Sequence, residues 1–158
     1  MTLNRQVYQT TGDLSAMRPG YRGAVGEHYN ISERCCDSWA AAAPDKAAII
    51  HLEEGGAQRV LTYGQLKRAS DGLAASFRAR GVARGDRVAV LLAQCPEVMI
   101  AHMAAYKLGA IVLPLFTLFG SDALAYRLAD SGARVVVTDS DNLDKVLALR
   151  AELPELRE

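Results

Sequence analysis

Metal and redox chemistry have little support in this sequence. Its 158 residues hold three cysteines, Cys35, Cys36 and Cys95, and no two of them have the CxxC spacing of a zinc or dithiol site. The three histidines lie far apart and form no HExxH pattern. Inward packing of one thiol of the adjacent pair is a better account of Cys35 and Cys36 than redox chemistry, because no base or second thiol stands at a useful spacing. We therefore expect neither a metal site nor a catalytic thiol.

An excess of charge of either sign is also missing. Lys and Arg together number 18, Asp and Glu together number 18, and the formal net charge is zero. This balance gives no electrostatic reason to expect a nucleic acid or an acidic membrane surface as a partner. Arg78, Arg80, Arg84 and Arg87 cluster around Asp86, which favours a solvated helix end over a basic patch.

No uninterrupted apolar run in the sequence has the length or the position that a membrane span or a secretory signal needs. The most apolar stretch, residues 88–119, is interrupted by charged residues and prolines. The first residues, MTLNRQVYQTTGD, lack the apolar region of a secretory signal. Together with the odd number of cysteines, these features predict a cytoplasmic protein with reduced thiols.

Motifs that identify a catalyst from its residues alone are missing as well. The sequence contains no GxxxxGK[ST] loop and no GxGxxG after a strand, so no backbone cradle for a phosphate is assigned, and it contains no GxSxG. The neighbouring Glu53 and Glu54 favour a solvated turn over acid–base chemistry. Asp139 follows an apolar strand, where open α/β sheets bind ligands, but a helix-cap role accounts for it equally well. The residues alone predict an α/β domain without a catalytic constellation.

The stretch from residue 85 to 115 carries the clearest structural signal. Residues 87–93 are apolar on both alternating faces, as in a strand covered from both sides of a parallel sheet. Pro96 suits the first position of a helix that runs to about Leu108, and Gly109 suits its end. Residues 99, 100, 103 and 104 are expected to be buried on that helix. A second strand over 110–113 stops at Pro114, which completes a right-handed βαβ unit.

Further elements precede this unit. Ser32 is expected to cap a helix over residues 33–43, with Trp39 as its core anchor. Residues 47–52 and 59–61 predict a hairpin with His51 on its polar side. Thr62 and Gln65 have the spacing of a capping box, which predicts a helix from there to about Arg80.

Other elements follow it. Ser121 is expected to cap a helix that ends near Gly132, and residues 134–138 predict another strand. A last helix over 142–152 is expected to turn Leu143, Val146 and Leu147 inward. This alternation predicts an α/β fold: a mostly parallel sheet with helices on both faces, formed by residues 30–158 after an irregular N-terminal lead-in at 1–29.

Short segments along residues 30–150 occur in an order that resembles the N-terminal part of the AMP-forming acyl-CoA synthetases, in the adenylate-forming ligase superfamily, acetyl-/medium-chain type. Each segment is weakly diagnostic alone, whereas their order and spacing together are specific. They are Asn30-Ile31, Pro44-Asp45-Lys46-Ala47, Leu61-Thr62-Tyr63, Gly81-Val82, Gly85-Asp86-Arg87-Val88, Cys95-Pro96-Glu97, Gly109-Ala110, Pro114-Leu115 and Ala125-Tyr126-Arg127-Leu128.

The resemblance implies a ligase. Complete members of the family use ATP and Mg²⁺ to convert a carboxylic acid to an acyl-adenylate with release of pyrophosphate, and CoA then displaces AMP. The family's phosphate loop, its adenine- and ribose-binding residues and its mobile C-terminal domain come later than anything in this chain. The chain is thus expected to be the first part of the large N-terminal domain of an ATP-dependent acid–CoA ligase, inactive alone and binding none of ATP, Mg²⁺ or CoA productively. The alternative is a stand-alone, non-catalytic α/β binding or interaction module, and a nucleotide-binding regulator is a weaker third idea.

One site follows from the resemblance. The loop after Pro114 corresponds to a segment that approaches the CoA pantetheine entrance, which implies that Thr117, Leu118 and Phe119 line that entrance. Aromatic packing of the loop on the sheet is the competing account. Because the parallel strands are expected to lack some neighbours, apolar surface should stay open and the chain is expected to self-associate.

Overall fold

The computed structural model of the chain describes residues 28–53 and 55–158. It contains an antiparallel hairpin and a three-stranded parallel sheet. The strands are β1 (Ala47–Leu52), β2 (Gln58–Thr62), β3 (Arg87–Leu91), β4 (Ile111–Leu115) and β5 (Val135–Thr138). The helices are η2 (Glu33–Asp37), α2 (Ser38–Ala42), α3 (Tyr63–Ala79), α4 (Pro96–Lys107), α5 (Ser121–Ser131), α6 (Ser140–Ala148) and η3 (Arg150–Glu152). The predicted α/β class is confirmed. The prediction of an irregular lead-in falls almost wholly outside the described residues.

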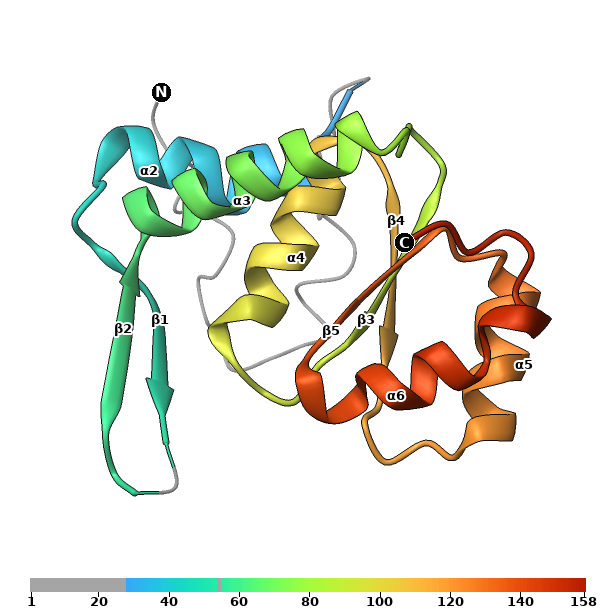
Figure 1. Ribbon diagram of the computed structural model, residues 1–158. Coiled ribbons are helices and arrows are strands. Elements are labelled where there is room, and N and C mark those ends of the chain that lie inside the picture. The colour runs from blue at the N-terminus through green and yellow to red at the C-terminus, as the bar shows by residue number, and fades with distance from the viewer. Residues whose placement is uncertain (1–27, 54) are drawn as a thin grey trace, which may run out of the picture.

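The parallel sheet has the strand order β4-β3-β5 (Figure 1). Val88 at its centre pairs with Val112 of β4 on one side and with Val135 of β5 on the other. The chain therefore leaves β3 toward one side and returns past it to reach β5. The edge of β5 is partly covered by residues 157 and 158, because Val136 N donates to Glu158 O at 3.0 Å and Arg157 N donates to Arg134 O, just before the strand, at 2.8 Å.

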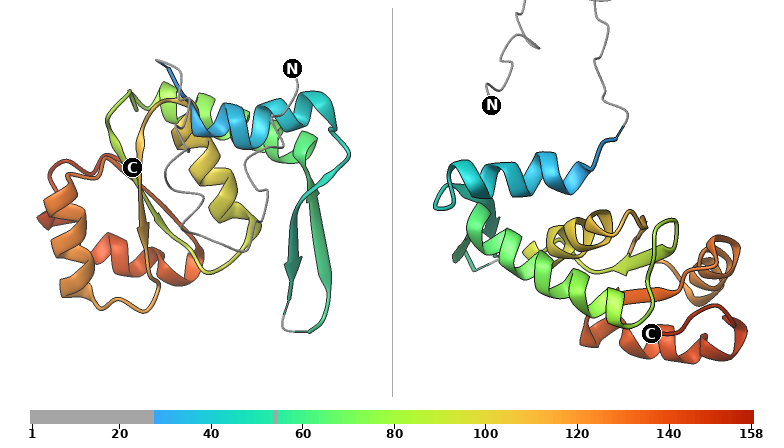
Figure 2. Two further views of the ribbon diagram at one scale, coloured as in Figure 1. Left: turned by 180° about the vertical axis from the view of Figure 1, so that it is seen from behind. Right: turned by 90° about the horizontal axis from the view of Figure 1, so that it is seen from above.

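Helices cover both faces of this sheet, as predicted (Figures 1 and 2). On one face Val88 packs in a core with Phe77 of α3 and Ala104 of α4. On the other face Leu91 packs in a core with Leu124 of α5 and Val146 of α6. Successive β3 residues point to opposite faces, so this strand is buried on both.

The central βαβ unit forms largely as the sequence predicts. Pro96 occupies the start of α4, and Gly109 follows its end with φ +67°, a backbone conformation that glycine adopts without strain. One boundary was wrong, because β4 continues through Pro114, which pairs with Val90. Proline lacks an N–H to donate, and β4 tolerates it because it is an edge strand. Met99 was also wrongly placed: it is 40% exposed, while Met103 is buried.

Two helix starts differ from the prediction. Asn30, not Ser32, caps the first helix, since its Oδ1 accepts hydrogen bonds from the backbone N–H groups of Ser32 and Glu33. Ser32 lies inside the helix and is fully buried. Gly120, rather than Ser121, is the N-cap of α5, without a side-chain cap bond. An Asx cap two residues earlier competes well with a serine cap, because both offer the same acceptor chemistry.

The inner face of α6 was predicted correctly at Val146 and wrongly at Leu143 and Leu147. Leu143 and Leu147 are 43% and 56% exposed, while Asn142 and Val146 are buried. The helix begins at Ser140, two residues before the predicted start, because Asp139 caps it. Asn142 turns inward because its side chain bonds to Asp139.

Two residues before the parallel sheet were also predicted wrongly. Trp39 is half-buried instead of a core anchor; its ring stacks on Tyr63 with centroids 5.6 Å apart. His51 is half-buried, whereas Ile50 and Leu52 on either side of it are exposed. The hairpin thus directs two aliphatic side chains to solvent, and its polar side is the reverse of the prediction.

Candidate functional site at the carboxyl edge of the sheet

The carboxyl ends of β3, β4 and β5 meet at one edge of the sheet. In open α/β sheets, ligands bind at this edge, beside the position where the strand order reverses. The order β4-β3-β5 reverses at β3, so the segments that follow the three strands are the candidate site. Two of them carry the residues singled out from the sequence: the loop 116–120 after β4 and Asp139 after β5.

The loop 116–120 is a compact turn with aromatic residues at both ends. Phe119 N donates to Phe116 O at 3.0 Å, and the two rings meet edge to face with centroids 5.9 Å apart. The guanidinium of Arg127 on α5 lies 4.3 Å from the centroid of Phe119. Leu118 is 79% exposed, whereas Thr117 and Phe119 are half-buried. The structure therefore places the three predicted residues side by side but exposes only Leu118 fully.

A chain of polar contacts joins this loop to α6. Asp139 Oδ1 accepts hydrogen bonds from the backbone N–H and the side-chain Nδ2 of Asn142, at 2.9 Å and 2.8 Å. Asn142 Oδ1 accepts from Lys145 Nζ at 3.1 Å. Lys145 Nζ also donates to Thr117 O at 2.9 Å. Asp139 is thus a helix cap, and the Asp139–Asn142–Lys145 series links the ends of both edge strands.

Lys145 and Asn142 were not among the residues expected at a site. A signal for them was present, because positions 139, 142 and 145 are three residues apart and share one side of a helix. The contact between Lys145 and Thr117 had no such signal, since 28 residues separate the two in sequence.

The chemistry available at this edge is that of binding. Lys145 and Arg127 supply cationic donors, and Phe116 and Leu118 supply exposed apolar surface. Cys95 precedes α4 at the same edge, but burial raises the pKa of its thiol, so that it stays protonated at neutral pH. Thr138 at the end of β5 buries a hydroxyl that has no hydrogen-bond partner among the described residues.

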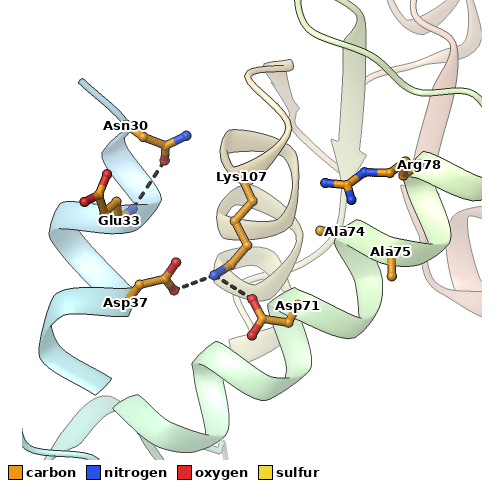
Figure 3. A pocket seen from close by; sticks show the side chains of 8 residues that line it. All are labelled: Asn30, Glu33, Asp37, Asp71, Ala74, Ala75, Arg78 and Lys107. Atoms are coloured by element: carbon orange, nitrogen blue, oxygen red, sulfur yellow. Dashed lines mark hydrogen bonds and ion pairs between the residues drawn. The ribbon is translucent and has the colours of Figure 1, made fainter. Parts of the chain in front are cut away.

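A separate hollow of about 460 Å³ lies between η2, α3 and α4 (Figure 3). Its base is an ion-pair network in which Lys107 Nζ contacts Asp37 and, at 2.8 Å, Asp71. Burial lowers the pKa of Lys107, but its hydrogen bonds to the two carboxylates outweigh burial and hold the pKa above the ordinary 10.5. Burial raises the pKa of Asp71, yet the hydrogen bonds from Lys107 and Lys67 outweigh it and leave the pKa below 3.8. Because these charges satisfy one another, we interpret the network as a connection between helices.

Neither a metal cluster nor a membrane span is found in the part of the chain that the structure describes. Across residues 28–53 and 55–158, no three His, Cys, Asp or Glu side chains gather in a way that could hold a metal ion. No helix in these ranges is both long and apolar enough to cross a bilayer. The cytoplasmic location stays a prediction.

Comparison with known proteins decides the family. The family described as AMP-binding enzyme matches residues 36–158. The chain belongs to this family. The predicted resemblance to the AMP-forming acyl-CoA synthetases is thereby confirmed, and the sheet edge described above is an edge of their fold.

Relatives and solved structures of this family agree. Acetyl-coenzyme A synthetase of Streptomyces coelicolor is 41% identical over 110 residues, which are 69% of this chain and 17% of the relative. The Emericella nidulans enzyme of the same name is 39% identical over 113 residues, 71% of this chain and 17% of the relative. The structure of acetoacetyl-CoA synthetase from Streptomyces lividans matches 81% of this chain and 21% of its own, with 30% identity and a TM-score of 0.75. The chain thus spans about 17% of the length of these curated relatives.

Proposed function

We propose that this chain is a part of an ATP-dependent acid–CoA ligase, which forms acyl-CoA, AMP and pyrophosphate from a carboxylate, ATP and CoA. The match of the AMP-binding enzyme family over residues 36–158 carries the proposal. Relatives named acetyl-coenzyme A synthetase cover most of the same residues and support a carboxylic acid and CoA as the substrates.

Within that enzyme, the chain supplies part of the scaffold and one wall of the CoA entrance. Thr117, Leu118 and Phe119 are the residues proposed for this wall. The pantetheine arm of CoA is a flexible chain of methylene and amide groups, and it needs apolar contact as well as hydrogen-bonding partners. The exposed Leu118 supplies the first, and the loop backbone supplies the second. ATP and Mg²⁺ supply the activation of the acid, for which this chain has no phosphate loop.

An activity assay tests the chemical part of the proposal. The chain by itself, incubated with ATP, Mg²⁺, CoA and acids from acetate to octanoate, is expected to release no pyrophosphate, because no group here positions the reacting phosphate. A complete acetyl-coenzyme A synthetase serves as the positive control. Pyrophosphate release above a protein-free blank would contradict the expectation that this chain is inactive by itself.

A stand-alone binding or interaction module is a second candidate, and one observation favours it. Both faces of the parallel sheet are covered by helices of this chain, so that Val88 and Leu91 are completely buried without any other polypeptide. The DNA downstream of the Glu158 codon separates the two candidates. A reading frame that continues into a Thr/Ser/Gly-rich loop ending in Lys supports the ligase, and a stop codon supports the module.

A further inference from the structure

Lys145 joins the loop proposed for the CoA entrance to α6. Its ammonium group donates to the carbonyl oxygen of Thr117 at 2.9 Å. This bond reaches from α6, which follows β5, to the loop that follows β4, and these are the two edge strands on either side of β3. The bond therefore spans the carboxyl edge of the sheet.

The position of the ammonium group is set from within α6. Asn142 is buried, and its amide is held by Asp139, the cap of the helix. The Oδ1 of Asn142 then accepts the second hydrogen bond of Lys145, at 3.1 Å. A lysine side chain is flexible when nothing holds it. Because the buried Asn142 already holds the Lys145 ammonium group, less conformational entropy is lost when Lys145 also bonds to the loop.

The other end of the loop is held separately. Arg127 stacks on Phe119. The Arg127 side chain also donates to Ala123 O at 3.0 Å, and this bond fixes the guanidinium group against α5. With Thr117 held by Lys145 and Phe119 held by Arg127, Leu118 between them projects into solvent, 79% exposed. The two anchors thus present one apolar side chain and the adjoining backbone in a defined position.

We infer that Lys145 is a positioning residue for CoA: it fixes the Thr117 carbonyl and thereby the orientation of the Leu118 side chain toward the pantetheine arm. This inference rests on the proposed function, since the ligand is the one proposed for the loop. Without the bond, the loop samples other conformations, and CoA binding must order it first.

The test uses the 158-residue chain, CoA as the probe, and amide NMR signals of the loop as the readout. The chain alone is not expected to bind CoA productively, so the test looks only for contact of CoA with this one wall. In the unaltered chain, rising CoA concentration is expected to shift the Thr117–Phe119 signals progressively. Lys145→Gln is expected to weaken this binding about fivefold to tenfold, in the range for the net contribution of one solvent-accessible hydrogen bond. Lys145→Arg keeps the charge and the donor, and is expected to restore most of the affinity.

Arg150→Gln is the matched control. Arg150 also donates to a backbone carbonyl, that of Arg157 at 2.8 Å, from the segment just after α6, so the substitution removes the same charge and the same kind of bond away from the loop. It is expected to leave the CoA titration unchanged.

The possible failures are distinguishable. A chain whose loop signals do not respond to CoA contradicts the proposed entrance itself and, with it, the role of Lys145. A normal titration that persists in Lys145→Gln contradicts only the role of Lys145. Equal losses in Lys145→Gln and Arg150→Gln show a general charge effect, and they also overturn that role.

Discussion

The strands β1 and β3 are similar in sequence and opposite in environment. Both are short and mostly aliphatic, AAIIHL in β1 and RVAVL in β3. In β3 Val88 and Leu91 are completely buried, whereas in β1 Ile50 and Leu52 are 61% and 68% exposed. An aliphatic run therefore indicates a strand but does not show how many of its faces are covered.

The difference follows from what packs against each strand. β3 lies between two layers of helices and between two neighbouring strands. β1 has one neighbouring strand, and its Ala48 and Ile49 pack, partly buried, against a core that contains Leu66 and Met103. A two-stranded hairpin is marginally stable by itself, so this hairpin depends on its packing against the rest of the chain, whereas the parallel sheet is buried on both faces.

Truncating one leucine in each strand is the strongest test of this contrast. Leu91→Ala is expected to lower the free energy of unfolding by about 2–5 kcal/mol, because it leaves a cavity in the core under α5 and α6. Leu52→Ala is expected to change it by less than about 0.5 kcal/mol. Urea unfolding followed by circular dichroism measures both. Similar losses for the two variants would show that the hairpin is as well packed as the sheet.

Substitutions in the ion-pair network of Asp37, Asp71 and Lys107 test how η2 is attached to α3 and α4. Lys107→Met is expected to cost about 1–3 kcal/mol near neutral pH, because it leaves Asp37 without its cation in a partly buried position. Asp71→Asn is expected to cost less, since Asp71 is more exposed and Lys107 keeps Asp37.

The pH dependence of that loss has a defined sign. The folded pKa of Asp71 lies below 3.8, so its contribution is present above that value and is lost as the pH falls through the folded pKa. The folded pKa of Lys107 lies above 10.5, so its contribution is present below that value and is lost as the pH rises through the folded pKa. The difference between the parent and Lys107→Met should therefore be largest between these limits and shrink outside them. A difference that does not vary with pH would assign the loss to packing of the lysine stem.

A smaller effect is expected at the junction of the hairpin and α3. Thr62 ends β2, and its side chain accepts a hydrogen bond from Gln65 N while the Gln65 side chain accepts from Thr62 N. Thr62→Ala is expected to cost about 1 kcal/mol through loss of the cap. Ser121→Ala at the start of α5, where no side-chain cap bond exists, is the control and should be close to neutral in thermal unfolding. Equal effects would mean that the capping bonds contribute nothing measurable.

The smallest effect on stability is expected on the outer face of the hairpin. Ile50→Thr combined with Leu52→Thr should change the free energy of unfolding by about 0.5 kcal/mol or less, because both side chains already face water. We propose that this face drives self-association, so the double variant should bind less hydrophobic dye and shift toward monomer in size-exclusion chromatography with light scattering. Val88→Thr, which buries a hydroxyl, is the destabilising counterpart in β3. An unchanged oligomeric state would locate the association surface elsewhere.

Signals that act over a few residues allowed most elements to be predicted. Pro96 and Gly109 bound α4, and Thr62 with Gln65 starts α3, because a cap or a turn depends on atoms within about one helical turn. The end of β4 was predicted wrongly at Pro114. A strand tolerates proline where it lies at the edge of a sheet, and the sequence does not show which strand is at the edge. The cap at Ser32 was also predicted wrongly, because Asn30 offered an equivalent cap nearby.

At the candidate site, the sequence was enough to single out the loop 116–120 and Asp139. The hydrogen bonds through Asn142 and Lys145 that connect them were not predicted. The chain's alternation of strands and helices determined the α/β class, and the order of its short motifs determined the family resemblance. Only the tertiary structure decided that Leu143 faces out, that Asn142 faces in and that Lys145 reaches Thr117. The physical reason is that burial and contacts across 28 residues depend on how the layers of helices and strands pack together, which no local pattern encodes.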